Sequence, residues 1–482
     1  MNRYFSIEGG ESDFPRRSFA RLDQTEPTDL TEASKAVFAF EAVDADWSGF
    51  GSGRAFALDD PDSILAWQRR LWSDSFGTSS RPPRMLEDPF DDVPLYRLEI
   101  TVSRVDSLFN QLVALGDDWV EIELDRYGSG VEVDVFAGLF FAPTVARLVG
   151  GPTPTPLAGA LSAAFDMDSW PDASSDEIER SLKPACTIDQ LAVFDVGQGS
   201  ASALICPHGA PQLWYDLGCG VYRNASTRPS YQLKFCVCGS AAIVLSHWDS
   251  DHWAGARRDL RMLARTWIAP RQKIGSTHKT FGSDILKSGG RILIVGHGAG
   301  PFAARTSAGQ ELSLRRCTGV DRNGSGLALI VEDTASGRGF MLTGDASYNH
   351  IPRPWPTDIA ALVVPHHGAD MGAASVPPLR PSAPKYARLL YSFGPGNKHG
   401  RTSVSHPTHA AMVAHDRQKW NHGLWTIGGA GLSVPGADVL ATAKHPATHL
   451  DGAMVGWTSA PAKSVKIACH SASGCSTPLT QS

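Results

Sequence analysis

One stretch decides the fold of this chain: Ser246-His247-Trp248-Asp249-Ser250-Asp251-His252-Trp253. It follows an apolar run, Ala241–Leu245, that is partly β-branched and too short for a typical helix. Such a run predicts a buried strand. Four side chains that can bind metals therefore leave the end of one strand together.

The spacing of these side chains predicts a metal site. In an extended loop, alternate side chains point the same way, so His247, Asp249 and Asp251 can converge on one point. His252 then reaches a second point nearby. Two imidazoles and two carboxylates form a mixed nitrogen and oxygen donor set, which suits Zn²⁺ or Mn²⁺ and differs from the thiolate sites of structural zinc. The alternative is a polar loop that binds nothing, but buried His and Asp are costly unless they are paired or coordinated.

The pattern His-x-Asp-x-Asp-His resembles the signature loop of the metallo-β-lactamase fold, whose commoner form is His-x-His-x-Asp-His. An Asp at the second position is similar to the branch that includes the soluble nuclease-like domain of ComEC-type competence proteins. Three further stretches resemble the same branch: Asp195-Val196-Gly197-Gln198-Gly199, Thr343-Gly344-Asp345 and Pro365-His366-His367-Gly368. The resemblance covers about residues 188–435. It implies an α/β architecture, the αβ/βα metallo-β-lactamase sandwich, with the site at the edge between two sheets.

The resemblance also implies roles for the remaining site residues. Asp345, at the end of a predicted strand, would bridge two cations. His366 would complete the shell of the second ion, with His367 nearby as a proton donor. His406 would be a ligand or a general acid, and an insertion in this chain separates it from Gly400. The expected metal ligands are His247, Asp249, Asp251, His252, Asp345 and His366, and the expected catalytic residues are Asp251, His367 and His406.

Other polar residues near strand ends are expected to support the ligands. Where lactamase relatives offer a His, the nearest candidate is Asn323, a weak ligand, so the first ion is expected to be held less tightly than the second. Asp216, in a strand that ends in Asp-x-Gly, is expected to fix a loop by hydrogen bonds. Asp195 and Gln198 are expected to be structural or to orient the ligands.

Turn glycines predict two hairpins. Gly197 and Gly199 separate the predicted strand at Leu191–Val196 from an extended run at Ala201–Cys206. Tyr127-Gly128-Ser129-Gly130 separates two alternating runs, Trp119–Leu124 and Val131–Val135.

Charge and composition divide the 482 residues into two modules. Residues 1–185 hold 16 Lys and Arg against 33 Asp and Glu, a net charge of −17, whereas the remainder holds 28 against 17, a net charge of +11. All 16 histidines lie in the second part. We therefore expect an acidic α+β domain of unknown role at 1–149, a linker at 150–187, a catalytic domain at 188–435 and a C-terminal extension at 436–482.

The function expected from the resemblance and the charge is metal-dependent hydrolysis of DNA or RNA, through a water molecule activated by two divalent ions, Zn²⁺ or Mn²⁺. Basic residues that flank the loop could hold a phosphodiester backbone, namely Arg257, Arg258, Arg261, Arg265 and Arg271. The alternatives are a hydrolase of a small ester, lactone or cyclic nucleotide, and a binding module without activity. The acidic domain could bind a protein partner or the basic part of this chain. No apolar run is long enough for a membrane span, and eight scattered cysteines without a disulfide pattern favour the cytoplasm.

Overall fold

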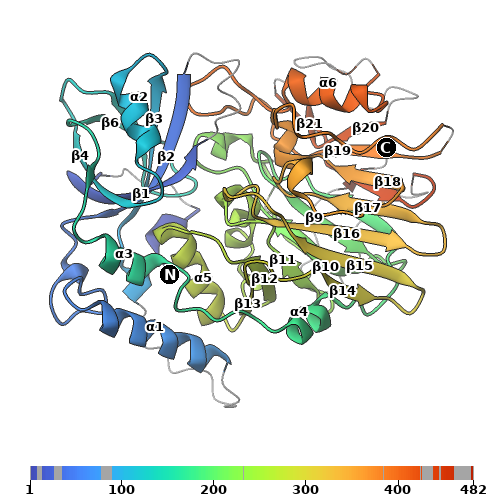
Figure 1. The fold of residues 1–482 in the computed structure, drawn as a ribbon, viewed down its shortest axis with the longest axis horizontal. Coiled ribbons are helices and arrows are strands. Elements are labelled where there is room, and N and C mark those ends of the chain that lie inside the picture. Colours follow the sequence, from blue (N-terminus) through green and yellow to red (C-terminus); the bar gives the residue numbers. More distant parts are fainter. Residues whose placement is uncertain are drawn as a thin grey trace. The chain divides into compact units, whose positions relative to one another are not determined.

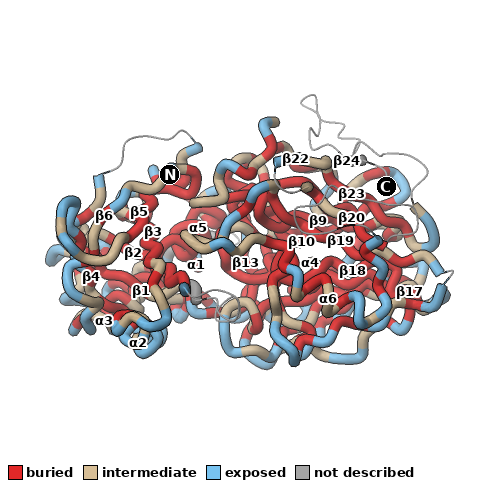
Figure 2. The backbone as a smooth tube through the Cα atoms, turned by 90° about the horizontal axis from the view of Figure 1, so that it is seen from above, coloured by how far each residue is buried: buried red, intermediate tan, exposed pale blue. Residues whose placement is uncertain are grey.

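The protein is described by a computed structural model that covers residues 2–7, 13–25, 35–76, 89–231, 233–383, 385–423, 425, 438–444, 447–460 and 479–480. It is a mixed α/β chain with several sheets (Figure 1). The buried stretches concentrate in the strands, and the exposed ones in the connections between them (Figure 2). No helix among the described residues is both long enough and apolar enough to cross a bilayer.

Contacts divide the chain into two compact units. Unit 1 comprises residues 1–171, 273–291 and 398–404, and unit 2 comprises residues 172–272, 292–397 and 405–482. Two short segments from the histidine-containing part of the sequence therefore belong to unit 1. One of them, 398–404, is the insertion that precedes His406.

Unit 1 is built on an antiparallel sheet in the order β1-β2-β3-β5-β6-β4-β7, in which β4 also pairs with β1. The extra pairing closes six strands into a ring around one apolar core. The strands are β1 (Arg17–Thr25), β2 (Lys35–Asp44), β3 (Leu95–Ser103), β4 (Trp119–Asp125), β5 (Glu132–Phe136), β6 (Thr144–Leu148) and β7 (Thr153–Pro154). The helices are α1 (Pro61–Phe76), α2 (Ser107–Ala114), α3 (Ala158–Phe165) and α5 (Ser276–Lys287).

The hairpin predicted around Tyr127–Gly130 is wrong. β4 and β5 do not pair with each other, because β6 lies between them and pairs with both. The apolar and β-branched residues of β6 compete for the same edges, so a turn signal alone could not fix the pairing.

Part of the acidic face of unit 1 is neutralised by an arginine of the same unit. Arg401 donates to Asp134 Oδ1 and Oδ2 at 2.6 and 2.8 Å, and also pairs with Glu132. The hydrogen bonds that Arg401 donates to Asp134 are the largest cause of a raised pKa of Arg401, and Glu132 raises it further against the effect of burial.

Unit 2 contains two larger sheets. The first has the order β13-β12-β11-β10-β9-β8-β23-β24 and the second the order β14-β15-β16-β17-β18-β19-β20. The strands of the first are β8 (Gln190–Val193), β9 (Ala201–Ile205), β10 (Pro211–Leu217), β11 (Ala242–Val244), β12 (Thr266–Pro270), β13 (Arg291–Val295), β23 (Gly452–Gly456) and β24 (Leu479–Thr480). Those of the second are β14 (Phe302–Arg305), β15 (Gln310–Arg316), β16 (Leu327–Asp333), β17 (Arg338–Leu342), β18 (Asp358–Val363), β19 (Arg388–Tyr391) and β20 (Val439–Ala441).

One apolar core joins the two sheets of unit 2. It takes alternate residues such as Leu213 and Val244 from the first sheet and Leu329 and Phe340 from the second, all buried. The outer face of the second sheet is covered by another cluster that includes Met412 of α6 (His409–Arg417). The hairpin predicted around Gly197 and Gly199 is confirmed, because β8 and β9 pair antiparallel.

Two ranges differ from the expected organisation. The range 150–187, expected as a linker, contains α3 and α4 (Ser175–Leu182), and α4 begins with a capping box between Ser174 and Glu177. The range after 435, expected as an extension, contributes β20 and β23 to the two sheets.

The direction of the strands places the candidate site. In the first sheet β10, β11 and β12 are parallel, and in the second sheet β17, β18, β19 and β20 are parallel. The polar segments after β11, β17 and β18 therefore all lie at carboxyl ends of parallel strands, where ligands bind in open α/β sheets.

Candidate metal centre

The loop 246–253 is fixed by its own tryptophans. Trp248 Nε1 donates to the Pro270 carbonyl at 2.8 Å, and Trp253 Nε1 donates to the Trp248 carbonyl at 2.7 Å. Both indole rings are fully buried. The loop is therefore held rigidly between β11 and β12, which orders the polar side chains that alternate with the rings.

Asp216, at the end of β10, organises the start of the loop as expected. Its carboxylate accepts hydrogen bonds from Ser246 N at 2.7 Å, from Ser246 Oγ at 2.9 Å and from His252 Nδ1 at 2.8 Å. Asp216 is fully buried and has a φ of 58°, a conformation that is rare for residues other than glycine. The prediction that this aspartate fixes a loop is confirmed.

These bonds determine which histidine nitrogens are left to act as ligands. Because the Ser246 hydroxyl donates to Asp216, its oxygen accepts from His247 Nδ1 at 3.0 Å. His252 donates from Nδ1 to Asp216, and His367 Nδ1 lies 2.8 Å from the Ser392 carbonyl, which can only accept. In the neutral form of each ring, which is the form that binds a metal, the lone pair is therefore on Nε2. A histidine that is oriented through one nitrogen and free at the other is the usual arrangement of a metal ligand.

The Nε2 atoms of His247 and His252 are buried and make no hydrogen bond. They face carboxylates instead: His247 Nε2 lies 3.3 Å from Asp249 Oδ2, and His252 Nε2 lies 3.2 Å from Asp345 Oδ1. Two ligand atoms on one tetrahedral zinc ion lie about 3.3 Å apart, because zinc bonds to N and O are about 2.0–2.2 Å long. The spacing and the donor types therefore fit a divalent cation.

Two groups of potential ligands share His252. One consists of Asp251, His252 and His367, and the other of His247, His252 and Asp345. His367 Nε2 lies 3.1 Å from Asp251 Oδ2. This places His367, expected as a proton donor, in a ligand position beside Asp251.

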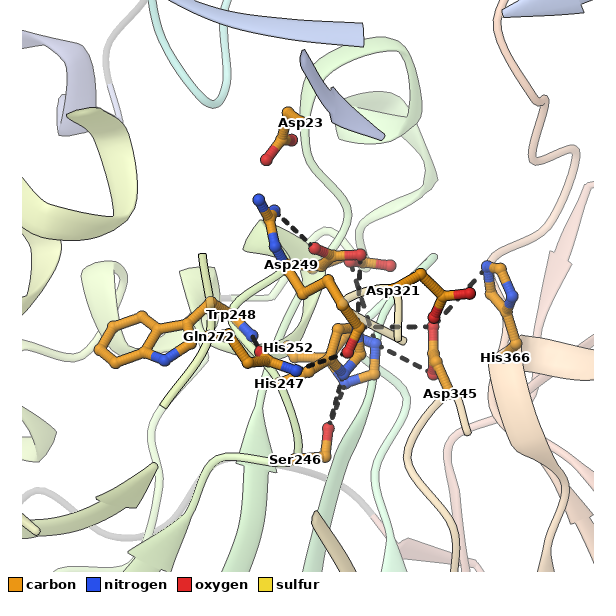
Figure 3. A network of polar contacts seen from close by, with 12 residues as sticks. Asp23, Ser246, His247, Trp248, Asp249, His252, Gln272, Asp321, Asp345 and His366 are labelled. Atoms are coloured by element: carbon orange, nitrogen blue, oxygen red, sulfur yellow. Dashed lines mark hydrogen bonds and ion pairs between the residues drawn. The ribbon is translucent and has the colours of Figure 1, made fainter. Parts of the chain in front are cut away.

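Asp345 lies at the centre of the site (Figure 3). Besides its contact with His252, its Oδ2 atom is 3.7 Å from Nε2 of His247, 3.7 Å from Nε2 of His366 and 3.9 Å from Nε2 of His367. The structure thus brings the expected bridging carboxylate next to histidines from both strand-end segments.

His366 and His406 lie at one edge of the site. Their ring centroids are 5.5 Å apart. Asn397 holds the His406 backbone at both ends, since its Oδ1 accepts from His406 N and its Nδ2 donates to the His406 carbonyl, each at 2.7 Å. His366 and His367 have φ of 49° and 55°. Unfavourable backbone conformations of this kind concentrate at functional sites.

Close backbone approach explains the glycines around Asp251. The Asp251 carbonyl accepts from Ser200 N at 3.1 Å, and a Cβ at Gly218 would lie only 1.6 Å from that carbonyl oxygen. A Cβ at Gly199 would lie 2.6 Å from the same atom. Ser200 makes this contact through its backbone. Asp195 and Gln198 are confirmed as structural: Asp195 accepts from Gly197 N, and Gln198 accepts from Gly394 N.

The histidines and carboxylates of the site polarise one another. Burial disfavours a charged His252, but three neighbouring carboxylates, Asp345 foremost, outweigh burial and raise the pKa of His252 well above its ordinary value. Burial likewise opposes ionisation of Asp345, but four histidines, His252 foremost, hold the pKa of Asp345 well below its ordinary value. The site therefore keeps its carboxylates ionised, as ligands of a cation must be.

The arginines expected to hold a phosphodiester are engaged within the chain. Each of four donates to a carbonyl or a carboxylate: Arg258 to the Tyr231 carbonyl, Arg261 to Asp259, Arg265 to the Gly239 carbonyl and Arg271 to Asp172. Arg257 is buried. These arginines are therefore committed, at least in part, to contacts within the chain.

Three supporting residues could not be assigned from the sequence: Asn397, Ser392 and Arg322. Arg322 Nη1 donates to Asp249 Oδ1 at 2.9 Å, next to the position where Asn323 was expected as a weak ligand. Ser392 acts through its carbonyl, which leaves no sequence signal. The only available signal for Asn397 was its place in the segment that precedes His406.

No family model matches this chain, and no curated protein matches its sequence.

Proposed function

We propose that this chain is a metal-dependent hydrolase of the metallo-β-lactamase fold that cleaves phosphodiester bonds in DNA or RNA. The observation that carries the proposal is the convergence of buried Nε2 atoms on ionised carboxylates in unit 2, with each Nδ1 atom used for orientation. The two-sheet architecture with polar side chains at the carboxyl ends of parallel strands supports the fold assignment.

Asp251, His252 and His367 would hold one ion, and His247 and Asp249 would form the other half of the site, with Asp345 between them. A divalent Zn²⁺ or Mn²⁺ ion bound there would supply Lewis acidity to a scissile phosphate and acidify a water molecule. The Asp251 carboxylate would accept a hydrogen bond from that water molecule and so orient it. His406, which is buried beside His366, is placed to donate a proton to the leaving alkoxide oxygen.

A second candidate is hydrolysis of a small ester, lactone or cyclic nucleotide. It is favoured by the internal hydrogen bonds of the arginines that flank the loop, because a long polyanion is held mainly by exposed cations.

The test is incubation of the purified chain with end-labelled single- and double-stranded DNA and RNA, in the presence of Zn²⁺, Mn²⁺ or a chelator. We expect cleavage that requires metal and is lost in Asp251→Asn. The control variant Asp333→Asn, in an exposed hairpin turn, should cleave at the wild-type rate. If no labelled polymer is cleaved with either metal, the nuclease proposal is wrong.

The same samples separate the two substrate classes. Activity on a nucleic acid should fall steeply between about 50 and 200 mM salt, because salt competes with phosphate contacts. Activity on small esters such as bis-p-nitrophenyl phosphate that is indifferent to salt, without cleavage of any polymer, would favour the second candidate.

A further inference from the structure

Arg322 is a largely buried residue that contacts the candidate metal centre through Asp249. Its guanidinium donates to Asp249 Oδ1 at 2.9 Å, and its side chain is only 11% exposed. Its carbonyl accepts from Gln272 Nε2 at 2.6 Å, and the same amide group donates to Ser325 Oγ at 2.9 Å. These bonds fix the turn from which the guanidinium projects.

Gln272 also ties this turn to the loop 246–253. Its Oε1 atom accepts from Trp248 N at 3.3 Å. Leu327 N, at the start of β16, donates to the Ser246 carbonyl at 2.7 Å, and a Cβ at Gly326 would lie 2.7 Å from that oxygen. The position of Arg322 relative to Asp249 is therefore set by the fold on both sides of the contact.

The two halves of the site differ because of this contact. In one half, Asp251 lies 3.1 Å from His367 Nε2 and 3.9 Å from His252 Nε2. Asp345 adds a second carboxylate, 3.2 Å from His252 Nε2. In the other half, Asp249 Oδ2 faces His247 while Asp249 Oδ1 is bound to a guanidinium. Arginine stays charged at any accessible pH, and its planar fork pairs well with carboxylates.

A divalent ion between His247 and Asp249 would have to share one carboxylate with that permanent charge. Like charges a few ångströms apart in a buried site repel strongly, because the surroundings screen them poorly. A divalent ion at His247 and Asp249 and the guanidinium of Arg322 therefore exclude each other.

We propose that the chain holds one tightly bound divalent ion, at Asp251, His252, His367 and Asp345, and that Arg322 supplies the second positive charge of the site. The inference rests on the proposed metal-dependent hydrolysis and makes it specific: the reacting group of the substrate is an anion, with one non-bridging oxygen beside the ion and another beside the guanidinium. Arg322 is thus a substrate-binding residue for phosphoesters, which neutral esters and lactones do not need.

The test measures metal stoichiometry in the whole chain, without any substrate. Wild type, Arg322→Ala, Arg322→Lys and a control, Arg305→Ala, are freed of metal and titrated with Zn²⁺, and bound zinc is counted after equilibrium dialysis. Arg305 is exposed and pairs with Glu311 on a hairpin, so its removal changes the net charge equally. We expect one tightly bound ion in wild type, Arg322→Lys and Arg305→Ala. In Arg322→Ala we expect a second ion that binds at least tenfold more tightly than in wild type.

Turnover provides a second readout. Arg322→Ala should lose about a hundredfold in kcat/KM toward a phosphodiester and recover much of it when Mn²⁺ is raised, because an extra ion then occupies the position of the guanidinium. Thermal denaturation of each variant with and without Zn²⁺ identifies any variant that fails to fold. If Arg322→Ala fails, Arg322→Met, which keeps a long side chain without its charge, carries the same expectation.

The outcomes separate this inference from the function on which it depends. Two equally tight ions in wild type, or one ion in Arg322→Ala at all zinc concentrations, would overturn the role of Arg322 and leave metal-dependent hydrolysis standing. An absence of bound zinc in wild type would overturn both.

Discussion

Each compact unit buries a cluster of carboxylates and histidine, but the two clusters are satisfied in different ways. In unit 1, Arg97 donates to Asp23 at 2.7 Å and to Glu99 at 3.1 Å. His278 Nε2 lies 3.2 Å from Asp23 and 3.1 Å from Glu41. Here the guanidinium and the imidazole contact the carboxylates directly, and the contacts of His278 hold α5 against the strands.

In unit 2 the histidines also lie beside carboxylates, but each of three is oriented through Nδ1 and presents Nε2 to the site. His247, His252 and His367 hydrogen bond through Nδ1 to a hydroxyl, a carboxylate and a carbonyl. Their Nε2 atoms converge on Asp251 and Asp345 from several strand ends. Burial of His and Asp is therefore a weak sign of a metal site. A stronger sign is a histidine that is oriented by a hydrogen bond at Nδ1 and presents Nε2 to the site.

The largest effect that sharpens this contrast is expected for Asp345→Asn. Removing the central carboxylate should release bound metal and lower turnover about a thousandfold or more, because its two oxygens together lie within 3.9 Å of the Nε2 atoms of all four histidines. Metal content and initial rates check this. The matched control is Asp358→Asn. Asp358 begins β18, at the end of the strand away from His366 and His367, and its carboxylate pairs with Lys385. Retained metal and rate in Asp345→Asn would contradict the assignment.

The corresponding change in unit 1 is Arg97→Met. It leaves two buried carboxylates without their guanidinium, so the free energy of unfolding should fall by about 3–5 kcal/mol. Urea denaturation measures this loss, and metal content should stay at the wild-type level. As a control, Arg17→Ala removes an exposed pair with Asp46 and should cost less than about 1 kcal/mol. Loss of metal in Arg97→Met would contradict the claim that the cluster in unit 1 has a purely structural role.

A smaller effect is expected for Asp216→Asn, which alters the hydrogen bonds that orient His252 and Ser246. The amide can no longer accept from both Ser246 and His252 as a carboxylate does, so metal affinity should fall about 10–100-fold. Competition with a chromogenic chelator measures the affinity. An unchanged affinity would show that the Nδ1 partner does not matter.

The smallest effect concerns a buried histidine of unit 2 that is outside the metal centre. His415 accepts from Tyr348 OH through Nε2 and donates from Nδ1 to the Ala411 carbonyl, each at 2.8 Å, and burial lowers its pKa to about 4. Its folded pKa lies below the value of about 6.5 in the unfolded chain, so the unfolded state binds more protons as pH falls. Its stabilising contribution is complete above pH 6.5 and declines toward pH 4. The loss should reach about 2 kcal/mol between pH 7 and pH 5.

His415→Gln isolates this contribution. The variant should lose less stability than wild type between pH 7 and pH 5 in urea denaturation. An equal loss in both proteins would assign the pH dependence to other groups.

Much of the candidate site could be predicted because its residues occupy strand ends that leave a sequence pattern. The loop from His247 to His252 follows a short apolar run, and Asp345 and the His366–His367 pair follow two others, so parallel strands bring them together. The role of Asp216 was predictable for the same reason.

The rest depends on tertiary pairing that local patterns do not encode. The sequence around Arg322 does not show that its guanidinium contacts Asp249. The strand β6 separates β4 from β5 although the turn at Tyr127–Gly130 favours a hairpin, and α5 belongs to unit 1 although it lies among the strands of unit 2 in the sequence. The helix α4 did carry a signal, the Ser174–Glu177 capping box, inside an acidic stretch with the composition of a linker.

The most direct test of the central claim is X-ray absorption at the zinc edge of the chain loaded with one equivalent of Zn²⁺. We predict a shell of nitrogen and oxygen atoms at about 2.0–2.1 Å, with outer scattering from the imidazoles of His252 and His367. A shell of sulfur atoms at about 2.3 Å, or zinc that remains fully hydrated in solution, would contradict the account.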